Sequence, residues 1–185
     1  MADKLSTVEL IERLARIVSG VGHSNAMKPA QWEALRYVSR ANRFSRTPGA
    51  LTAYLGATKG TVSQTLMSLE RAGLVAKTVN AADRRSVRLD LTEAGCDRLR
   101  RDEMARIQVI VDALPEPDRL RLDDALRELL KTRIKLEGGR AFGLCRTCRH
   151  FAANARGPAE HHCRLLDEPL ADTEADEICY EQEAA

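Results

Sequence analysis

The sequence predicts a mainly α-helical fold with one small β-hairpin and a short cysteine-rich module at its C-terminal end. Three observations lead to this prediction. Apolar residues recur at helical spacing through much of the first 137 residues, the period changes toward two around residues 75–91, and four of the five cysteines lie in the last 41 of 185 residues. We therefore divide the chain at Gly138-Gly139 into a domain over residues 1–139 and a tail over residues 140–185.

Two helices are predicted before residue 41. The first covers about residues 5–21, where apolar side chains recur at helical spacing behind a serine or threonine cap. The second covers residues 29–40 and has Pro29 in its first turn, where a missing N–H costs nothing. We expect Trp32 and Tyr37 on this helix to serve the core and an interface.

The next two helices predict a helix-turn-helix. A short helix has Thr47 as its N-cap and ends at Gly56, and a second one begins near Lys59 and ends at Gly73. One stripe of the second helix is apolar, with Val62, Leu66 and Leu69. Its N-terminal end carries the hydrogen-bonding side chains of Thr61, Ser63, Gln64 and Thr65. Two helices joined by a glycine-containing turn, the second polar at its start, are typical of this motif.

A β-hairpin, or wing, follows the helix-turn-helix. Residues 75–79 and 87–91 alternate between apolar and other side chains on either side of a polar loop. The tip of that loop contains Asp83, Arg84 and Arg85. A long helix is predicted from Thr92 to about Ala113, and a last one from Asp118 to Glu137 after two prolines.

Four motifs in this region resemble the MarR family of bacterial winged-helix regulators. They are Thr58-Lys59-Gly60-Thr61-Val62-Ser63-Gln64, Leu69-Glu70-Arg71-Ala72-Gly73-Leu74-Val75, Asp83-Arg84-Arg85 and Leu91-Thr92-Glu93-Ala94-Gly95. The resemblance implies an obligate homodimer in which helices at about 5–21 and 92–137 interlock. It also implies that the helix-turn-helix and wing, at about 47–91, reach successive major grooves of a palindromic operator in double-stranded DNA.

The expected DNA-binding residues are Thr58, Lys59, Gly60, Thr61, Ser63, Gln64, Thr65, Asp83, Arg84 and Arg85. A recognition helix buries one stripe and presents short polar side chains to base edges, which agrees with the pattern of residues 59–73. Lys59 and the helix N-terminus can bind phosphate, and Gln64 could read adenine. The resemblance assigns Arg84 or Arg85 to the minor groove, where the potential is negative.

Charge is segregated along the chain although the formal net charge is only +2. Residues 36–106 carry 14 basic and 7 acidic groups, which suits an anionic partner, whereas residues 157–185 carry 1 basic and 9 acidic groups. No apolar run approaches the roughly 18 to 20 residues of a membrane span, and no secretory signal is apparent. We therefore expect a cytoplasmic protein with no membrane partner.

The tail contains four cysteines, at Cys145, Cys148, Cys163 and Cys179, the first two as a C-x2-C pair. Four thiolates are enough to hold one zinc ion or one iron–sulfur cluster, and metal binding would supply folding free energy to a segment with few large apolar residues. We expect a structural zinc ion. A 4Fe-4S cluster is the alternative because the second pair is split, and unligated thiols are a third. We expect the three tail histidines at the surface or beside the ligands.

We expect a regulator and not an enzyme. A dithiol oxidoreductase using Cys145 and Cys148 is disfavoured because no βαβ pattern surrounds them, and no phosphate loop or nucleophile motif is present. Repression by occupying a promoter is the default mechanism, with a small-molecule effector or a metal or redox signal. A cluster would make the protein a redox, oxygen or iron sensor.

Three further residues outside these motifs have expected roles. We expect Cys96 to be a small buried residue, with an oxidation-sensing thiol as the alternative. We expect Arg43 and Arg46 to be solvated.

Overall fold

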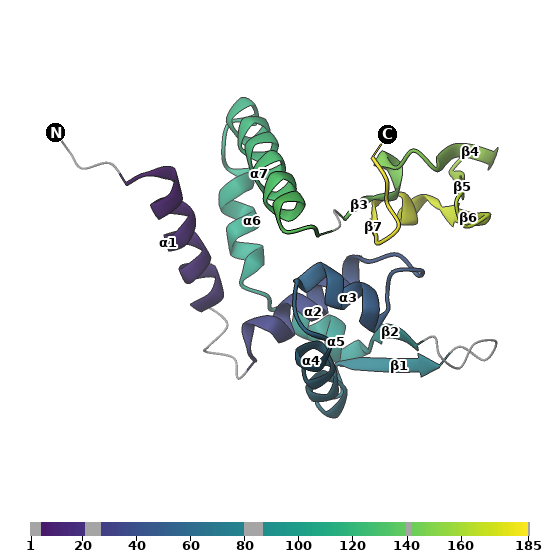
Figure 1. Ribbon diagram of the computed structural model, residues 1–185, viewed down its shortest axis with the longest axis horizontal. Helices are drawn as coiled ribbons and strands as arrows, with labels where there is room; N and C mark the ends of the chain where they lie inside the picture. Colours follow the sequence, from purple (N-terminus) through teal and green to yellow (C-terminus); the bar gives the residue numbers. More distant parts are fainter. Residues whose placement is uncertain (1–4, 21–26, 80–86, 140–141, 185) are drawn as a thin grey trace.

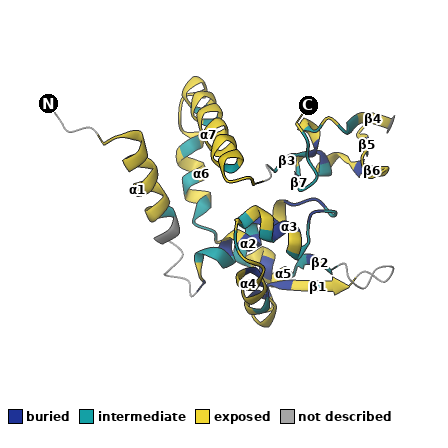
Figure 2. Cartoon of the chain, in the orientation of Figure 1, coloured by how far each residue is buried: buried dark blue, intermediate teal, exposed yellow. Residues whose placement is uncertain are grey.

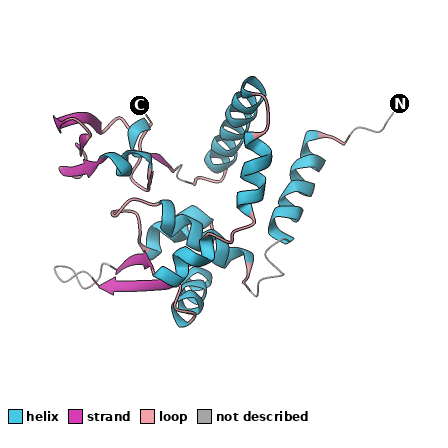
Figure 3. Ribbon diagram, turned by 180° about the vertical axis from the view of Figure 1, so that it is seen from behind, coloured by secondary structure: helices cyan, strands magenta, loops and turns pink. Residues whose placement is uncertain are grey.

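The computed structural model describes residues 5–20, 27–79, 87–139 and 142–184. A winged-helix body lies at the centre of the chain (Figure 1). Three further helices extend to one side of this body, and the cysteine-rich tail packs on another side. The strands are confined to the wing and the tail, as the view from behind shows (Figure 3). Within the described residues, no helix is long and apolar enough to cross a membrane.

The three helices of the body begin and end close to the predicted residues. They are α2 (Pro29–Arg40), α3 (Pro48–Leu55) and α4 (Lys59–Arg71). The Thr47 and Thr58 hydroxyls cap α3 and α4, each accepting a backbone N–H three residues on at 3.2 Å. Gly56 ends α3 with a φ of 58°, a conformation that favours glycine. These caps fix where the turn between α3 and α4 lies.

Strands β1 (Val75–Val79) and β2 (Val87–Leu91) form the predicted antiparallel hairpin, with Val75 opposite Leu91 and Val79 opposite Val87. The wing tip that joins them lies outside the described residues. The core between the hairpin and the body helices includes the fully buried side chains of Leu35, Tyr37, Leu51, Val62, Leu66, Leu69, Val75 and Leu89. Trp32 is buried with them, as predicted.

The prediction of one long helix from Thr92 to Ala113 is wrong, because the structure has two helices in this range. These are α5 (Glu93–Leu99) and α6 (Met104–Asp112). Asp102, between them, accepts two hydrogen bonds from the Arg36 guanidinium at 2.5 and 2.7 Å, and its Oδ1 also accepts the N–H of Met104 at 3.0 Å. Burial opposes ionisation of Asp102, but these bonds prevail and lower its pKa. A tertiary ion pair therefore sets the break.

Three helices of the chain leave their apolar side chains uncovered (Figure 2). They are α1 (Thr7–Gly20), α6 and α7 (Glu116–Leu136). Neither α6 nor α7 has a buried residue within the protomer. The exposed apolar side chains on the three helices include Val8, Leu10, Leu14, Ile17, Val109, Ile110, Leu122, Leu126, Leu129 and Leu130. Such a large apolar surface is typical of an interface.

Cys96 is exposed, so the prediction that it is buried is wrong. The preceding residue, Gly95, takes the buried position on α5. A Cβ at Gly95 would collide with the backbone carbonyl oxygen of Leu74. Since glycine is needed where α5 presses against the chain after α4, Cys96 is turned toward the surface.

The tail forms two small antiparallel sheets that the sequence did not predict. Strand β3 (Gly143–Leu144) pairs with β7 (Ile178–Cys179), and β4 (Phe151–Gly157), β5 (Glu160–Cys163) and β6 (Glu168–Ala171) form the other sheet. Short helical turns, η2 (Cys145–Thr147) and η3 (Asp172–Asp176), connect them. Ile178 packs into the core of the body, so the tail is continuous with it.

Candidate DNA-binding surface and cysteine cluster

Helix α4 separates its apolar and polar residues. Val62, Leu66 and Leu69 are buried against the body. All the predicted α4 contact residues are exposed except Thr65, which is half-buried, and they lie at the N-terminal end. This end of the helix has unpaired backbone N–H groups and the positive end of the helix dipole, both of which favour an anion.

The hydroxyl groups at the start of α4 bond within the helix. Thr58 caps the helix and shares a 2.9 Å hydrogen bond with the hydroxyl of Thr61, and Thr65 donates to the Thr61 carbonyl oxygen at 3.0 Å. Ser63 and Gln64 are exposed, and no side-chain hydrogen bond is recorded for either within the described part of the chain. Of the polar residues on α4, these two are the most available to a partner.

A groove of about 420 Å³ runs between α3, α4 and the hairpin. Lys59 and Lys77 line it from α4 and β1, and Gly49 and Ser63 also contribute to its wall. Gly60 has only the Thr58 hydroxyl within 4 Å of its missing side chain, so its own fold does not require glycine. Lys77 also forms an ion pair with Glu70 at 2.8 Å, so the positive charge of the groove wall comes mainly from Lys59 at the start of α4. The predicted residues Asp83, Arg84 and Arg85 lie outside the described residues.

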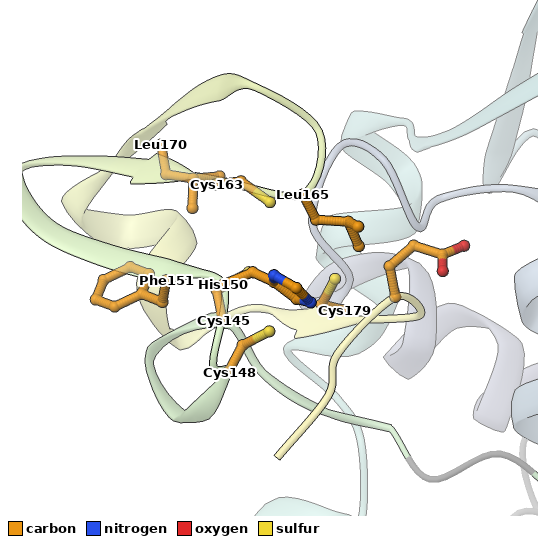
Figure 4. A pocket seen from close by; sticks show the side chains of 9 residues that line it. Cys145, Cys148, His150, Phe151, Cys163, Leu165, Leu170 and Cys179 are labelled. Carbon is orange, nitrogen blue, oxygen red and sulfur yellow. The ribbon is translucent and has the colours of Figure 1, made fainter. Parts of the chain in front are cut away.

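The four tail cysteines line one pocket, together with His150 (Figure 4). Cys145 begins the turn η2 and Cys148 follows its last residue, while Cys163 ends β5 and Cys179 ends β7. Cys145 and Cys179 are buried, and all four are free thiols. The four cysteines that the sequence places together as a metal site therefore share one pocket. Among the described residues, however, no three side chains of Cys, His, Asp or Glu are arranged as a site for one metal ion as they stand.

The thiol groups in this cluster are held by hydrogen bonds. Asn42 Nδ2 donates to Cys145 Sγ at 3.3 Å, and the N–H of Glu183 donates to Cys148 Sγ at 3.5 Å. A hydrogen bond from the Cys145 thiol lowers the pKa of Cys179 to about 6, against the effect of burial, and Ser45 and Glu181 assist it. The same bond raises the pKa of Cys145. Of these two thiols, Cys179 therefore has the lower pKa.

The tail histidines differ in position. His150 lines the pocket and lies 3.6 Å from the Glu183 carboxylate. His161 is buried and forms a 3.1 Å pair with Asp172, and His162 lies 3.0 Å from Asp167. Neither of these two lines the pocket. His150 is therefore the histidine placed to reach a group held by the thiols.

Sequence reasoning missed the part that the loop between α2 and α3 plays at this cluster. Asn42 is buried and bonds to Cys145, and Ser45 bonds to the tail at Tyr180. Arg43 and Arg46, predicted to be solvated, both form ion pairs: Arg43 holds the Glu174 carboxylate at 2.5 and 2.6 Å, and Arg46 pairs with Asp90 at 3.2 Å. Only the polar, arginine-rich composition of the loop hinted at such a role.

Residues 27–86 match the MarR family. Three solved structures have the same fold at low sequence identity. They are a complex of MepR from Staphylococcus aureus with DNA (TM-score 0.57, 20% identity, 70% of this chain and 99% of that one), the transcriptional regulator SlyA (0.58, 17%, 71% and 96%) and a MarR transcriptional regulator from Methanosarcina mazei Go1 (0.55, 20%, 70% and 94%). No curated protein sequence gives a significant match.

Proposed function

Because residues 27–86 are those of a MarR-family winged helix, we propose that this protein is a sequence-specific DNA-binding transcriptional regulator. The observation that carries the proposal is α4, which buries Val62, Leu66 and Leu69 and leaves a polar, capped N-terminal end beside the groove that Lys59 lines. A helix with one apolar face and one polar end can enter the major groove while its apolar face stays packed in its own domain. The similar fold of the MepR–DNA complex supports the proposal.

Base reading falls mainly to Ser63 and Gln64 in this proposal. Both are exposed on α4, whereas the neighbouring threonines bond within the helix. Gln64 can form two hydrogen bonds with adenine, and a serine hydroxyl can serve several bases. Lys59, at the first turn, contacts phosphate and fixes the register. The two wing arginines are proposed to enter the minor groove.

The regulator is proposed to act as a homodimer on a palindromic operator. The uncovered apolar residues of α1, α6 and α7 are those that a second copy of the chain would bury. Two-fold symmetry then sets two α4 helices against two half-sites one helical turn apart, about 34–36 Å. Occupying a promoter in this way represses transcription, in the cytoplasm and without an enzymatic step. A small-molecule effector could bind between the dimer helices and the body.

Operator selection from random duplex DNA, followed by binding titrations, tests this proposal. We expect the selected sites to be palindromic, and Gln64→Ala to weaken binding to them by about 1–3 kcal/mol and to relax one base position. Gln108→Ala is the matched control, because Gln108 lies on α6 and bonds to Asp112 within that helix. Failure of the wild-type protein to enrich any sequence would overturn the proposal.

A further inference from the structure

The tail of this protein has no function in the proposed DNA contact, yet it brings four thiols together. Cys145 and Cys148 are three residues apart, Cys163 and Cys179 come from the ends of β5 and β7, and all four line a common pocket (Figure 4). Phe151, Leu165, Leu170 and Glu181 also line this pocket. A mostly apolar wall with thiols on several sides is an environment in which metal–thiolate bonds are favoured.

Donors to the sulfur atoms add to this picture. An amide N–H from Asn42 points to Cys145, and a backbone N–H points to Cys148. Hydrogen bonds donated to sulfur stabilise thiolate over thiol and orient metal ligands. A cluster of cysteines that served only as apolar filling would not need such donors.

The tail also has little other means of holding itself together. In its own hydrophobic cluster, the buried residues are Cys145, Leu170 and Cys179, with Phe44 of the body and two half-buried tail residues against them. Two of these three are the thiols themselves. Segments of this size usually need a bound metal or covalent link to fold stably.

Two thiols of the pocket are tied to the loop between α2 and α3. Asn42 bonds to Cys145, and its backbone N–H donates to the carbonyl oxygen of Ile178 at 2.9 Å, next to Cys179. Ser45 Oγ accepts the N–H of Tyr180, the residue next to Cys179, at 2.8 Å. Any movement of these sulfur atoms therefore acts on the loop directly.

The other side of the same loop holds the DNA-binding elements. Thr47 caps α3, and the carbonyl oxygen of Arg46 accepts the N–H of Leu89 in β2 at 2.7 Å. Tyr37 donates to the Ser45 carbonyl oxygen at 2.7 Å from within the core of the body. The loop thus touches the cysteine pocket on one side and the start of the helix-turn-helix and the wing on the other.

We propose that Cys145, Cys148, Cys163 and Cys179 bind one thiolate-held metal centre whose loading sets the position of the loop between α2 and α3 and thereby the affinity for DNA. The metal centre itself does not depend on the proposed function, whereas the effect of its loading on DNA affinity rests on that function. Zinc is the expected occupant, with a 4Fe-4S cluster offering the same four-thiolate chemistry. A bound centre would fix the positions of the four sulfur atoms relative to one another. It would therefore act on Asn42, which bonds to Cys145, and on Ser45, which bonds to the residue after Cys179.

The first measurement is metal analysis with a visible spectrum on the full chain, purified without oxygen. Colourless protein with one zinc per chain supports the centre with zinc in it. Brown protein with iron and acid-labile sulfide supports the centre with a cluster in it. Protein with neither metal, which also fails to bind added Zn²⁺ after reduction, overturns the centre and leaves the proposed DNA function intact.

The second measurement compares Cys163→Ser with Cys96→Ser. Both remove one thiol, but Cys163 lines the pocket and Cys96 lies on the exposed surface of α5. We expect Cys163→Ser to lose the metal and to bind the selected operator about tenfold more weakly, a typical size for coupling between two sites. Cys96→Ser should keep both. Loss of metal with unchanged DNA affinity would overturn the coupling alone.

A third variant separates the coupling from general damage to the tail. Asn42→Asp keeps the four cysteines and a side chain of the same shape, but it removes the N–H that donates to Cys145. We expect it to retain metal, while the difference in DNA affinity between loaded and chelator-treated protein shrinks. An unchanged difference would contradict transmission through Asn42. If no state of any variant bound DNA, the proposed function would fail, whereas the metal analysis would still decide the centre.

Discussion

The winged-helix body and the cysteine tail are built from different kinds of buried residue. Fully buried leucines such as Leu35, Leu51 and Leu66 fill the body, and each contributes about 1.5–3 kcal/mol by its burial. The buried centre of the tail is two cysteines and a leucine. The difference teaches that the body is stable through its own apolar contacts, while the tail depends on the body and on what its thiols bind.

The largest expected effect probes the apolar core of the body. Leu66→Ala should lower the free energy of unfolding by about 2–5 kcal/mol, because it leaves a cavity among residues that cannot close it. Chemical denaturation followed by circular dichroism measures this loss. Leu166→Ala is the control, since Leu166 is exposed in the tail, away from the predicted dimer helices, and should cost much less. Equal losses in both variants would break the comparison.

A smaller effect is expected on DNA affinity, and it tests whether the wing or the tail contacts DNA. Arg85→Ala in the wing should weaken operator binding by about 1–3 kcal/mol, through loss of the proposed groove contact, without unfolding the protein. Arg164→Ala removes the same charge from an exposed tail position and should leave affinity almost unchanged. Fluorescence anisotropy at fixed salt compares the two. If both variants lost affinity equally, the effect would be one of net charge and not of the wing.

The smallest effect concerns the junction between the body and the helices with exposed apolar faces. Asp102→Asn should cost about 1 kcal/mol at neutral pH, because it weakens the paired bonds from Arg36. The folded pKa of Asp102 is lowered, so its stabilisation is present above the ordinary pKa of an aspartate and is lost as pH falls through the folded pKa. The difference from wild type should therefore vanish in acid. Asp97→Asn, which removes a carboxylate from the exposed ion pair with Arg100 at the end of α5, is the matched control.

Local signals predicted most of the body. Thr47 and Gly56 mark helix ends through bonds to residues only a few positions away, and the hairpin follows from a change of period on either side of one loop. The cysteines could also be grouped, because a thiol-rich segment has few other uses. All these features depend on neighbours in sequence or on residue type alone.

Contacts between distant residues explain what could not be predicted. The break before α6 depends on Arg36 and Asp102, which are 66 residues apart. The contact of Asn42 with Cys145 spans 103 residues, and neither residue reveals its partner. Cys96 was misjudged because its surroundings are set by the fit of Gly95 against Leu74, which a helical period cannot show. The tail strands are short, and their pairing is decided by the docking on the body.

Because Ile178 lies near the C-terminal end of the sequence, the core of the winged-helix body is completed late in synthesis. Its side chain belongs to the core of the body, and its carbonyl oxygen accepts the N–H of Asn42, so one piece of the DNA-binding domain is made long after the wing. During synthesis, the winged helix therefore emerges from the ribosome before its last core residue exists. A message cut short upstream of that codon would yield a protein that has every residue proposed to contact DNA but lacks the core side chain beside the loop between α2 and α3.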